Sequence, residues 1–349
     1  MDQINIHKEA LIKTAAAMSA DSKGLLAMDE STPTCNKRFA QNKIPQTEEA
    51  RRAYRELIVT TPGLSEFISG AILYDETIRQ SSKDGKPFIK ILIDAGIMPG
   101  IKVDTGAKDL SFYPGEKITE GLDGLRERLS EYAKMGARFA KWRGVIAIDE
   151  KSIPSRYGIK ANAHALARYA ALCQEANLVP IVEPEVLMDG NHSIERCYEV
   201  TEAVLRAVFN ELYQAKVLLQ GMILKPNMVL PGLASPKQVA VEEVADSTIQ
   251  CFLSCVPAAV PAVTFLSGGQ AYELASARLN AMNLRFKSKL PWAVAFSFSR
   301  AIQEPALQIW KGQESNVKAA QHALYHRAKC NSAARRGEYT AEMEKKNDN

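Results

Sequence analysis

Short apolar runs recur at fairly regular intervals along the chain and alternate with longer amphipathic segments. Nearly every position in a run is apolar, which is typical of strands buried on both faces of a parallel sheet. The eight runs are GLLAMDE (24–30), ISGAILY (68–74), PGIKVD (99–104), RFAKWRG (138–144), VPIVEPE (179–185), GMILKPN (221–227), AVTFLSGG (262–269) and AVAFSFS (293–299).

The segments between these runs have the apolar spacing of amphipathic helices. Helices are predicted over 47–58, 122–135, 161–175, 194–213, 236–255, 270–280 and 305–329, preceded by an N-terminal helix in MDQINIHKEALIKTAA. Helical crossovers between successive strands force a parallel sheet. Eight such units in roughly 280 residues fit a closed barrel. The alternative is an open doubly wound sheet, which would normally have a Gly-rich phosphate loop after its first strand, and GLLAMDESTP has none.

The predicted fold class is therefore α/β, a (β/α)8 TIM barrel with an extra N-terminal helix and a C-terminal tail. No low-complexity linker divides the sequence, so we expect a single barrel domain over residues 1–336. The last stretch, GEYTAEMEKKNDN, is polar and charged. Residues 337–349 are accordingly predicted to form a mobile tail.

Composition narrows the class of protein. The 349 residues are 46% hydrophobic and 24% charged, which excludes disordered and fibrous classes. The formal charge of +4 is small and scattered, so no nucleic-acid partner is expected. The six cysteines show no CxxC spacing and suggest a reducing compartment. The N-terminus resembles neither a signal nor a transit peptide, and no run is long enough to span a membrane, so a cytoplasmic protein without a membrane partner is expected.

Polar residues gather at the C-terminal ends of the runs, where the active sites of barrels are built. Each alone could be a helix cap, a turn or a surface charge. Charges inside contexts such as LLAMD, FAKWR, IVEPE and MILKP, however, are costly to bury unless paired or used, which favours one shared polar site. The residues are Asp29, Glu30, Lys102, Asp104, Lys141, Arg143, Glu183, Glu185, Lys225, Ser267, Gly268, Gly269, Ser297, Ser299 and Arg300.

The residue types indicate the chemistry. The sequence has no His/Cys/Asp cluster with metal spacing, and His322 and His326 are interpreted as a helix surface, so we expect no metal and no cofactor. A lysine that forms an imine with a carbonyl can serve instead, and Lys225 and Lys141 both qualify. Glu183, Glu185 and Asp29 would be the acids and bases.

Two groups of residues could bind anions. The backbone N–H groups of 267–269 open onto a predicted helix and could bind phosphate together with Arg300. Lys102 and Arg143 could hold a second anionic group.

Several segments resemble the class I (Schiff-base) fructose-1,6-bisphosphate aldolases. The motifs are LLAMDEST, GIKVD, GARFAKWR, LVPIVEPE, LKPNMV, TFLSGGQ, LNAMN and PWAVAFSFSRA, from about residue 5 to residue 340. PAVPAVTFLSGG and FSFSRA are closer to the plant and cyanobacterial branch than to the animal one.

The resemblance implies a homotetrameric barrel that reversibly cleaves fructose-1,6-bisphosphate to dihydroxyacetone phosphate and glyceraldehyde-3-phosphate. It implies that Lys225 forms the imine, that Glu183 is the general acid/base, and that Glu185 and Lys141 shape the charge on the lysine. It implies that Asp29 takes the C4 hydroxyl proton. The implied phosphate ligands are Ser267, Gly268 and Arg300 for C1, with Gly269 and Ser297 beside them, and Ser31, Thr34, Arg38, Lys102 and Arg143 for C6.

Alternatives stay open. Sedoheptulose-1,7-bisphosphate or fructose-1-phosphate could be the preferred substrate, and a transaldolase-like enzyme would need only one phosphate site. A non-catalytic scaffold would usually lack Lys225, Glu183 or Asp29, which are all present. Thr105 and Thr34 depart from the family, which usually has Lys and Ser there.

The tail also departs from the family pattern, because many members end in a tyrosine that assists proton exchange at C3 of the enamine. Here the chain ends in NDN and its last tyrosine is Tyr339. We expect slower proton exchange than in tailed members, with cleavage intact, measured as tritium exchange from dihydroxyacetone phosphate. Complete loss of exchange in Tyr339→Phe would contradict this, because Tyr339 would then have taken over the role.

Overall fold

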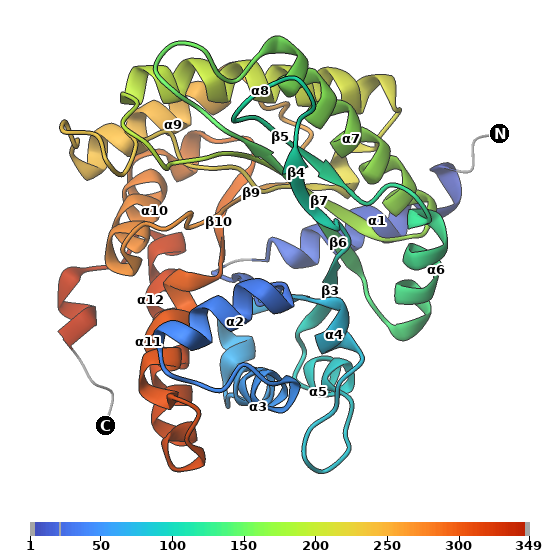
Figure 1. Cartoon of the computed structure of the whole chain (residues 1–349). Helices are drawn as coiled ribbons and strands as arrows, with labels where there is room; N and C mark the ends of the chain where they lie inside the picture. The colour runs from blue at the N-terminus through green and yellow to red at the C-terminus, as the bar shows by residue number, and fades with distance from the viewer. Residues whose placement is uncertain (1–3, 21, 346–349) are drawn as a thin grey trace.

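Eight parallel strands close into a barrel within residues 4–20 and 22–345, the part of the chain that the computed structural model describes (Figure 1). Each of the eight apolar runs overlaps one of them, so the predicted (β/α)8 barrel is confirmed. Around the barrel the order is β1, β2, β3, β6, β7, β8, β9, β10. The bounds are β1 Gly24–Ala27, β2 Ile68–Leu73, β3 Met98–Lys102, β6 Phe139–Ile146, β7 Val179–Val186, β8 Ile223–Leu224, β9 Ala262–Phe265 and β10 Ala293–Phe298.

Helices surround these strands in Figure 1, and α1 precedes the first strand. No described helix is long and apolar enough to cross a membrane. The longer ones are α1 Ile4–Met18, α2 Thr32–Gln41, α3 Glu48–Val59, α5 Phe88–Asp94, α6 Leu125–Met135, α7 Arg156–Glu175, α8 Ile194–Gln214, α9 Val241–Cys255, α10 Tyr272–Phe286, α11 Arg300–Trp310 and α12 Val317–Arg336.

The sequence prediction lacked the helices α2, α4 (Asp75–Ile78) and α5, and two further features differ from it. The single helix predicted over 305–329 is wrong, because α11 ends at Trp310 and α12 begins at Val317. Lys311 and Gly312 take left-handed backbone angles there, which a continuous right-handed helix cannot contain. A polar antiparallel hairpin, β4 (Gly106–Asp109) and β5 (Lys117–Glu120), lies outside the barrel and was missed because it has no apolar run.

The barrel has an inner and an outer apolar cluster. The outer cluster lies between strands and helices and includes Leu26, Ile101 and Trp142. The inner cluster fills the barrel toward the N-terminal ends of the strands, with members such as Leu25, Phe139, Val179, Ile181 and Ile223. Leu11, Ala15 and Met18 of α1 belong to this inner cluster, so the extra N-terminal helix closes one end of the barrel.

Side-chain alternation connects the inner cluster to the polar end. Successive residues of a strand point to opposite faces, so residues two apart share one face. Phe139 and Lys141 therefore share a face, as do Ile181 and Glu183, and Ile223 and Lys225. In each pair the residue nearer the N-terminal end of the strand is apolar, and the residue nearer the C-terminal end is charged. One face of each strand thus supplies both the barrel core and the polar site.

The predicted domain boundary falls at the end of α12. Gly337 follows Arg336 with a left-handed φ of 80°. Tyr339 is 8% exposed, and a short 3₁₀ helix, η5 (Ala341–Lys345), follows it. Residues 346–349 lie outside the described residues, and the mobility of the tail stays a prediction.

Candidate active site

A cavity of about 340 Å³ opens at the C-terminal ends of the strands. Every candidate catalytic or substrate-binding residue from the sequence lines it, except Gly269. The lining residues are Ala27, Asp29, Glu30, Ser31, Thr34, Arg38, Lys102, Asp104, Gly106, Ala107, Lys141, Arg143, Val145, Glu183, Glu185, Lys225, Leu266, Ser267, Gly268, Ser297, Ser299 and Arg300.

Two lysines and two carboxylates form the floor of the cavity. Lys141 Nζ lies 2.7 Å from Asp29 Oδ2 and 3.0 Å from Glu183 Oε2. The other carboxylate oxygen of Glu183, Oε1, lies 3.2 Å from Lys225 Nζ. All four residues are buried. Glu183 therefore bridges the two lysines, and we call these four residues the floor quartet.

The strand ladder sets the positions of the quartet. The Lys225 backbone N–H donates to Val182 O at 2.8 Å, which places Lys225 beside Glu183 at the end of β8. Arg143 of β6 is in register with Glu183 of β7. Asn227 Oδ1 accepts from the Val186 N–H at 3.0 Å and ties the chain after Lys225 to the end of β7. Asn227 was missed as a candidate although it stands in LKPN, because the motif does not show which way its amide points.

The charges within the quartet shift the pKa values of its own members. Burial alone would raise the pKa of Asp29 and of Glu183, but the charges of Lys141 and Lys225 outweigh it and lower both. Burial alone would lower the pKa of Lys141, but Asp29 and Glu183 outweigh it and raise it. The carboxylates are thus held ionised and Lys141 is held protonated.

Two more cations of the cavity are paired beside the floor. The Lys102 ammonium lies 2.8 Å from Asp104 Oδ1, and the Arg143 guanidinium contacts Glu185. Asp104 also accepts the Arg143 backbone N–H at 3.2 Å. A substrate anion at Lys102 or Arg143 would therefore share the cation with a protein carboxylate.

Arg300 differs from these cations, because it forms no ion pair with any residue that the structure describes. It begins α11, and its guanidinium lies against Gly269, where a Cβ would come within 2.9 Å of Nη2. Gly268 and Gly269 both have left-handed φ angles, 59° and 103°. The buried Ser297 hydroxyl has no hydrogen-bond partner among the described residues. This side of the cavity has unused donors for an anion.

A second carboxylate network supports the cavity wall and was not predicted. Glu30 is buried and pairs with Arg38 at 2.5 Å and with Arg55 at 2.8 Å. Ser299 Oγ donates to Glu30 at 2.5 Å, and Gln303 Nε2 donates at 3.0 Å. Burial opposes ionisation of Glu30, but the two arginines outweigh it and lower its pKa. The network joins the segment after β1 to the start of α11.

The remaining candidates are placed as follows. Ser31 Oγ and Thr34 Oγ1 lie 3.0 Å apart at the start of α2, on the cavity rim. Tyr339 does not line the cavity, and its hydroxyl donates to Glu344 Oε1 at 2.8 Å. The cavity therefore combines an amine beside a carboxylate, a second carboxylate held by Lys141, and anion donors on one side. That set can form an imine, move protons and hold phosphate.

Comparison with known proteins agrees with this chemistry. Residues 10–349 match the family model described as fructose-bisphosphate aldolase class-I. A "Probable fructose-bisphosphate aldolase class 1" of Xanthomonas campestris pathovar campestris is 58% identical over 95% of this chain and 98% of its own. The cytosolic fructose-bisphosphate aldolase 6 of Arabidopsis thaliana is 51% identical over 95% of this chain and 92% of its own. The solved Plasmodium falciparum fructose-bisphosphate aldolase superposes with a TM-score of 0.94 at 46% identity, covering 96% of both chains.

The lowered carboxylate pKa values predict a pH dependence of stability. Groups with a folded-state pKa below the unfolded value stabilise the protein above that unfolded value and cease to do so as the pH falls. For Asp29 and Glu183 the ordinary values are 3.8 and 4.5. The free energy of unfolding should therefore fall as the pH drops below 4.5, measured by urea unfolding.

Asp29→Asn should flatten this fall by up to about 1.4 kcal/mol per pH unit. Asp123→Asn serves as the matched control, because Asp123 is exposed and lines no part of the cavity. Equal slopes in the wild type and Asp29→Asn would contradict the prediction.

Proposed function

The chain belongs to the class I fructose-bisphosphate aldolase family, and we propose that the floor quartet performs its reversible Schiff-base cleavage of fructose-1,6-bisphosphate. The observation that carries the assignment of roles is Glu183 between Lys225 and Lys141, with Asp29 on the far side of Lys141.

Imine formation would begin at Lys225. Its Nζ attacks the C2 carbonyl carbon of the open-chain sugar, and loss of water leaves the protonated imine. Glu183, 3.2 Å from Nζ, would take one proton from the ammonium of the Lys225–Glu183 ion pair before the amine attacks. The nitrogen would lose a second proton to the new C2 oxygen after the attack, and Glu183 would return its proton to the departing hydroxyl, which leaves as water. Lys141 and Lys225 keep Glu183 ionised at the start, which is the form that accepts a proton. Glu185, which is paired with Arg143, would add negative charge near the site of proton transfer between Lys225 and Glu183.

Cleavage would use the other carboxylate. Asp29 would take the C4 hydroxyl proton while the C3–C4 bond breaks and its electrons move to the imine, which releases glyceraldehyde-3-phosphate. The resulting enamine takes a proton at C3, and hydrolysis returns Lys225 and releases dihydroxyacetone phosphate. Lys141, 2.7 Å from Asp29, would keep that carboxylate ionised and stabilise negative charge that develops on oxygen.

Phosphate binding would divide between the two sides of the cavity. We assign the C1 phosphate to Arg300, Ser267, the backbone N–H groups of Gly268 and Gly269, and Ser297. The unpaired guanidinium and the unsatisfied Ser297 hydroxyl support this choice. We assign the C6 phosphate to Ser31, Thr34, Arg38, Lys102 and Arg143, which line the same cavity.

The wider setting is also proposed. A homotetramer in the cytoplasm is the assembly that the family resemblance implies, and the Arabidopsis relatives named as cytosolic support the location. The family resemblance also implies that the reaction needs no cofactor.

Borohydride trapping tests the central assignment. Reduction in the presence of dihydroxyacetone phosphate should leave a stable adduct that peptide mass spectrometry maps to Lys225. Lys225→Arg should abolish both adduct and cleavage, whereas the exposed Lys216→Arg should leave both unchanged. Activity that EDTA abolishes, with no adduct formed, would refute the imine mechanism.

The phosphate assignment predicts a split between two substrates, since fructose-1-phosphate lacks the C6 group. Arg300→Ala should lower kcat/KM for both substrates by about 10–100-fold, the cost of a charged hydrogen bond. Lys102→Met should lower kcat/KM for fructose-1,6-bisphosphate but leave kcat/KM for fructose-1-phosphate unchanged. Equal losses on both substrates in Lys102→Met would show that the C6 assignment is wrong.

A further inference from the structure

Three metal-ligating side chains of different chemistry converge outside the barrel mouth. His326 and Cys330 stand four residues apart on α12 and therefore share one helix face. Glu344 of η5 reaches the same place from the end of the described chain. One ligand atom from each of the three lies within 4.8 Å of the other two. We call these residues the tail cluster.

The spacing of the tail cluster fits a small tetrahedral ion. His326 Nε2 lies 3.6 Å from Cys330 Sγ and 3.8 Å from Glu344 Oε2. A zinc ion with bonds of about 2.0 Å to nitrogen and oxygen and about 2.3 Å to sulfur would place its ligand atoms about 3.3–3.6 Å apart. These two separations are within a few tenths of an ångström of zinc geometry, and the third pair, Cys330 and Glu344, lies within 4.8 Å and would close in as the ion binds.

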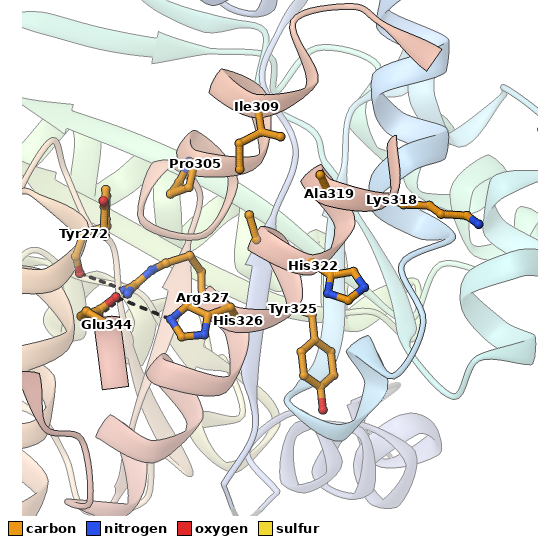
Figure 2. Close-up of a pocket in the computed structure, with 11 residues that line it drawn as sticks. Tyr272, Pro305, Ile309, Lys318, Ala319, His322, Tyr325, His326, Arg327 and Glu344 are labelled. Atoms are coloured by element: carbon orange, nitrogen blue, oxygen red, sulfur yellow. Dashed lines mark hydrogen bonds and ion pairs between the residues drawn. The ribbon is translucent and has the colours of Figure 1, made fainter. Parts of the chain in front are cut away.

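The surroundings hold the ligands in place. Figure 2 shows the His326 ring and the Glu344 carboxylate directed toward one another, with the Arg327 guanidinium beside the carboxylate. Arg327 contacts Glu344 Oε1, and Tyr339 donates to the same oxygen at 2.8 Å, which leaves Oε2 on the His326 side. Cys330 is completely buried. The Glu344 carboxylate is thus oriented before any ion arrives, as supporting contacts orient ligands in metal sites.

A route for the ion and a fourth ligand is also present. His326, Arg327 and Glu344 line a cavity of about 590 Å³, drawn in Figure 2, between α10, α11 and α12. It is open to solvent, so water can complete a four-coordinate site. Imidazole, thiolate and carboxylate together suit Zn²⁺ better than Mg²⁺ or Ca²⁺, which prefer oxygen ligands alone.

We propose that His326, Cys330 and Glu344 bind a Zn²⁺ ion that fastens the segment Ala341–Lys345 to α12. On binding, the Cys330 thiol releases its proton to solvent, and sulfur, the His326 nitrogen, the Glu344 oxygen and one water coordinate the ion. The site is separate from the floor quartet, so it does not depend on the catalytic roles proposed above. The sequence hides it, because the partner of His326 is a cysteine one turn onward and a glutamate at the end of the chain, not His322.

The test is zinc binding by the full-length protein. We expect a single Zn²⁺ per chain by elemental analysis after gel filtration, and slower hydrogen exchange of the backbone amides of 341–345 when zinc is present. His326→Gln, Cys330→Ser and Glu344→Gln should each weaken zinc affinity by more than about 100-fold, since loss even of a supporting contact costs about 10–100-fold. Bound Co²⁺ should show a thiolate charge-transfer absorption that Cys330→Ser removes.

Matched controls replace the same residue types nearby or elsewhere. His322→Gln, Glu342→Gln and Cys255→Ser should leave zinc affinity unchanged, because none of the three belongs to the tail cluster. Retained aldol cleavage in every variant shows that the barrel is folded and separates this test from that of the catalytic proposal. Absence of stoichiometric zinc, or equal loss of zinc in the ligand and control variants, would overturn the proposal.

Discussion

The balance of buried charges in the floor quartet is the constraint on which the polar end of the barrel depends. Asp29 and Glu183 are ionised because Lys141 and Lys225 lie beside them, and Lys141 is protonated because both carboxylates contact it. Removing one member of such a buried set leaves an unmatched charge, which costs about 3–5 kcal/mol. In the proposed mechanism the same four groups are the nucleophile, the bases and the electrostatic partner of the imine chemistry. The proposal therefore makes stability and function rest on the same contacts.

The barrel interior accommodates these buried charges because the inward faces of the strands form an apolar layer at one end and a charged layer at the other. Toward the N-terminal ends the inward positions are apolar and α1 closes the barrel with Leu11, Ala15 and Met18. Two residues further along the strands, the same faces carry Lys141, Glu183 and other charges. The apolar layer excludes water from the side of the floor quartet that faces away from the cavity, which strengthens the charge interactions within the quartet. Because the strands are parallel, their charged ends all meet at one mouth.

Not every cation in that mouth has a carboxylate partner. Lys102, Lys141, Arg143 and Lys225 each contact a carboxylate of the site, whereas Arg300 forms no ion pair among the described residues. A count of cations in the sequence treats all five as equal phosphate ligands. In the structure, four of these cations are paired with carboxylates, whereas the guanidinium of Arg300 has no carboxylate partner among the described residues. In the cavity wall, the Glu30 carboxylate likewise forms ion pairs with two arginines, Arg38 and Arg55.

The sequence alone was enough to predict the eight strands, the closed barrel and the residues of the polar mouth, because apolar periodicity and the position of charges at strand ends are local properties of the chain. It did not determine the break between α11 and α12, the hairpin β4–β5, or the network around Glu30. It interpreted His326 as a surface residue, although its neighbours are Cys330 and Glu344. Which cation of the floor quartet meets which carboxylate became visible in the fold alone, since those pairs join residues far apart in the chain. The distance and direction between such side chains follow from barrel closure and strand register, which no local pattern contains.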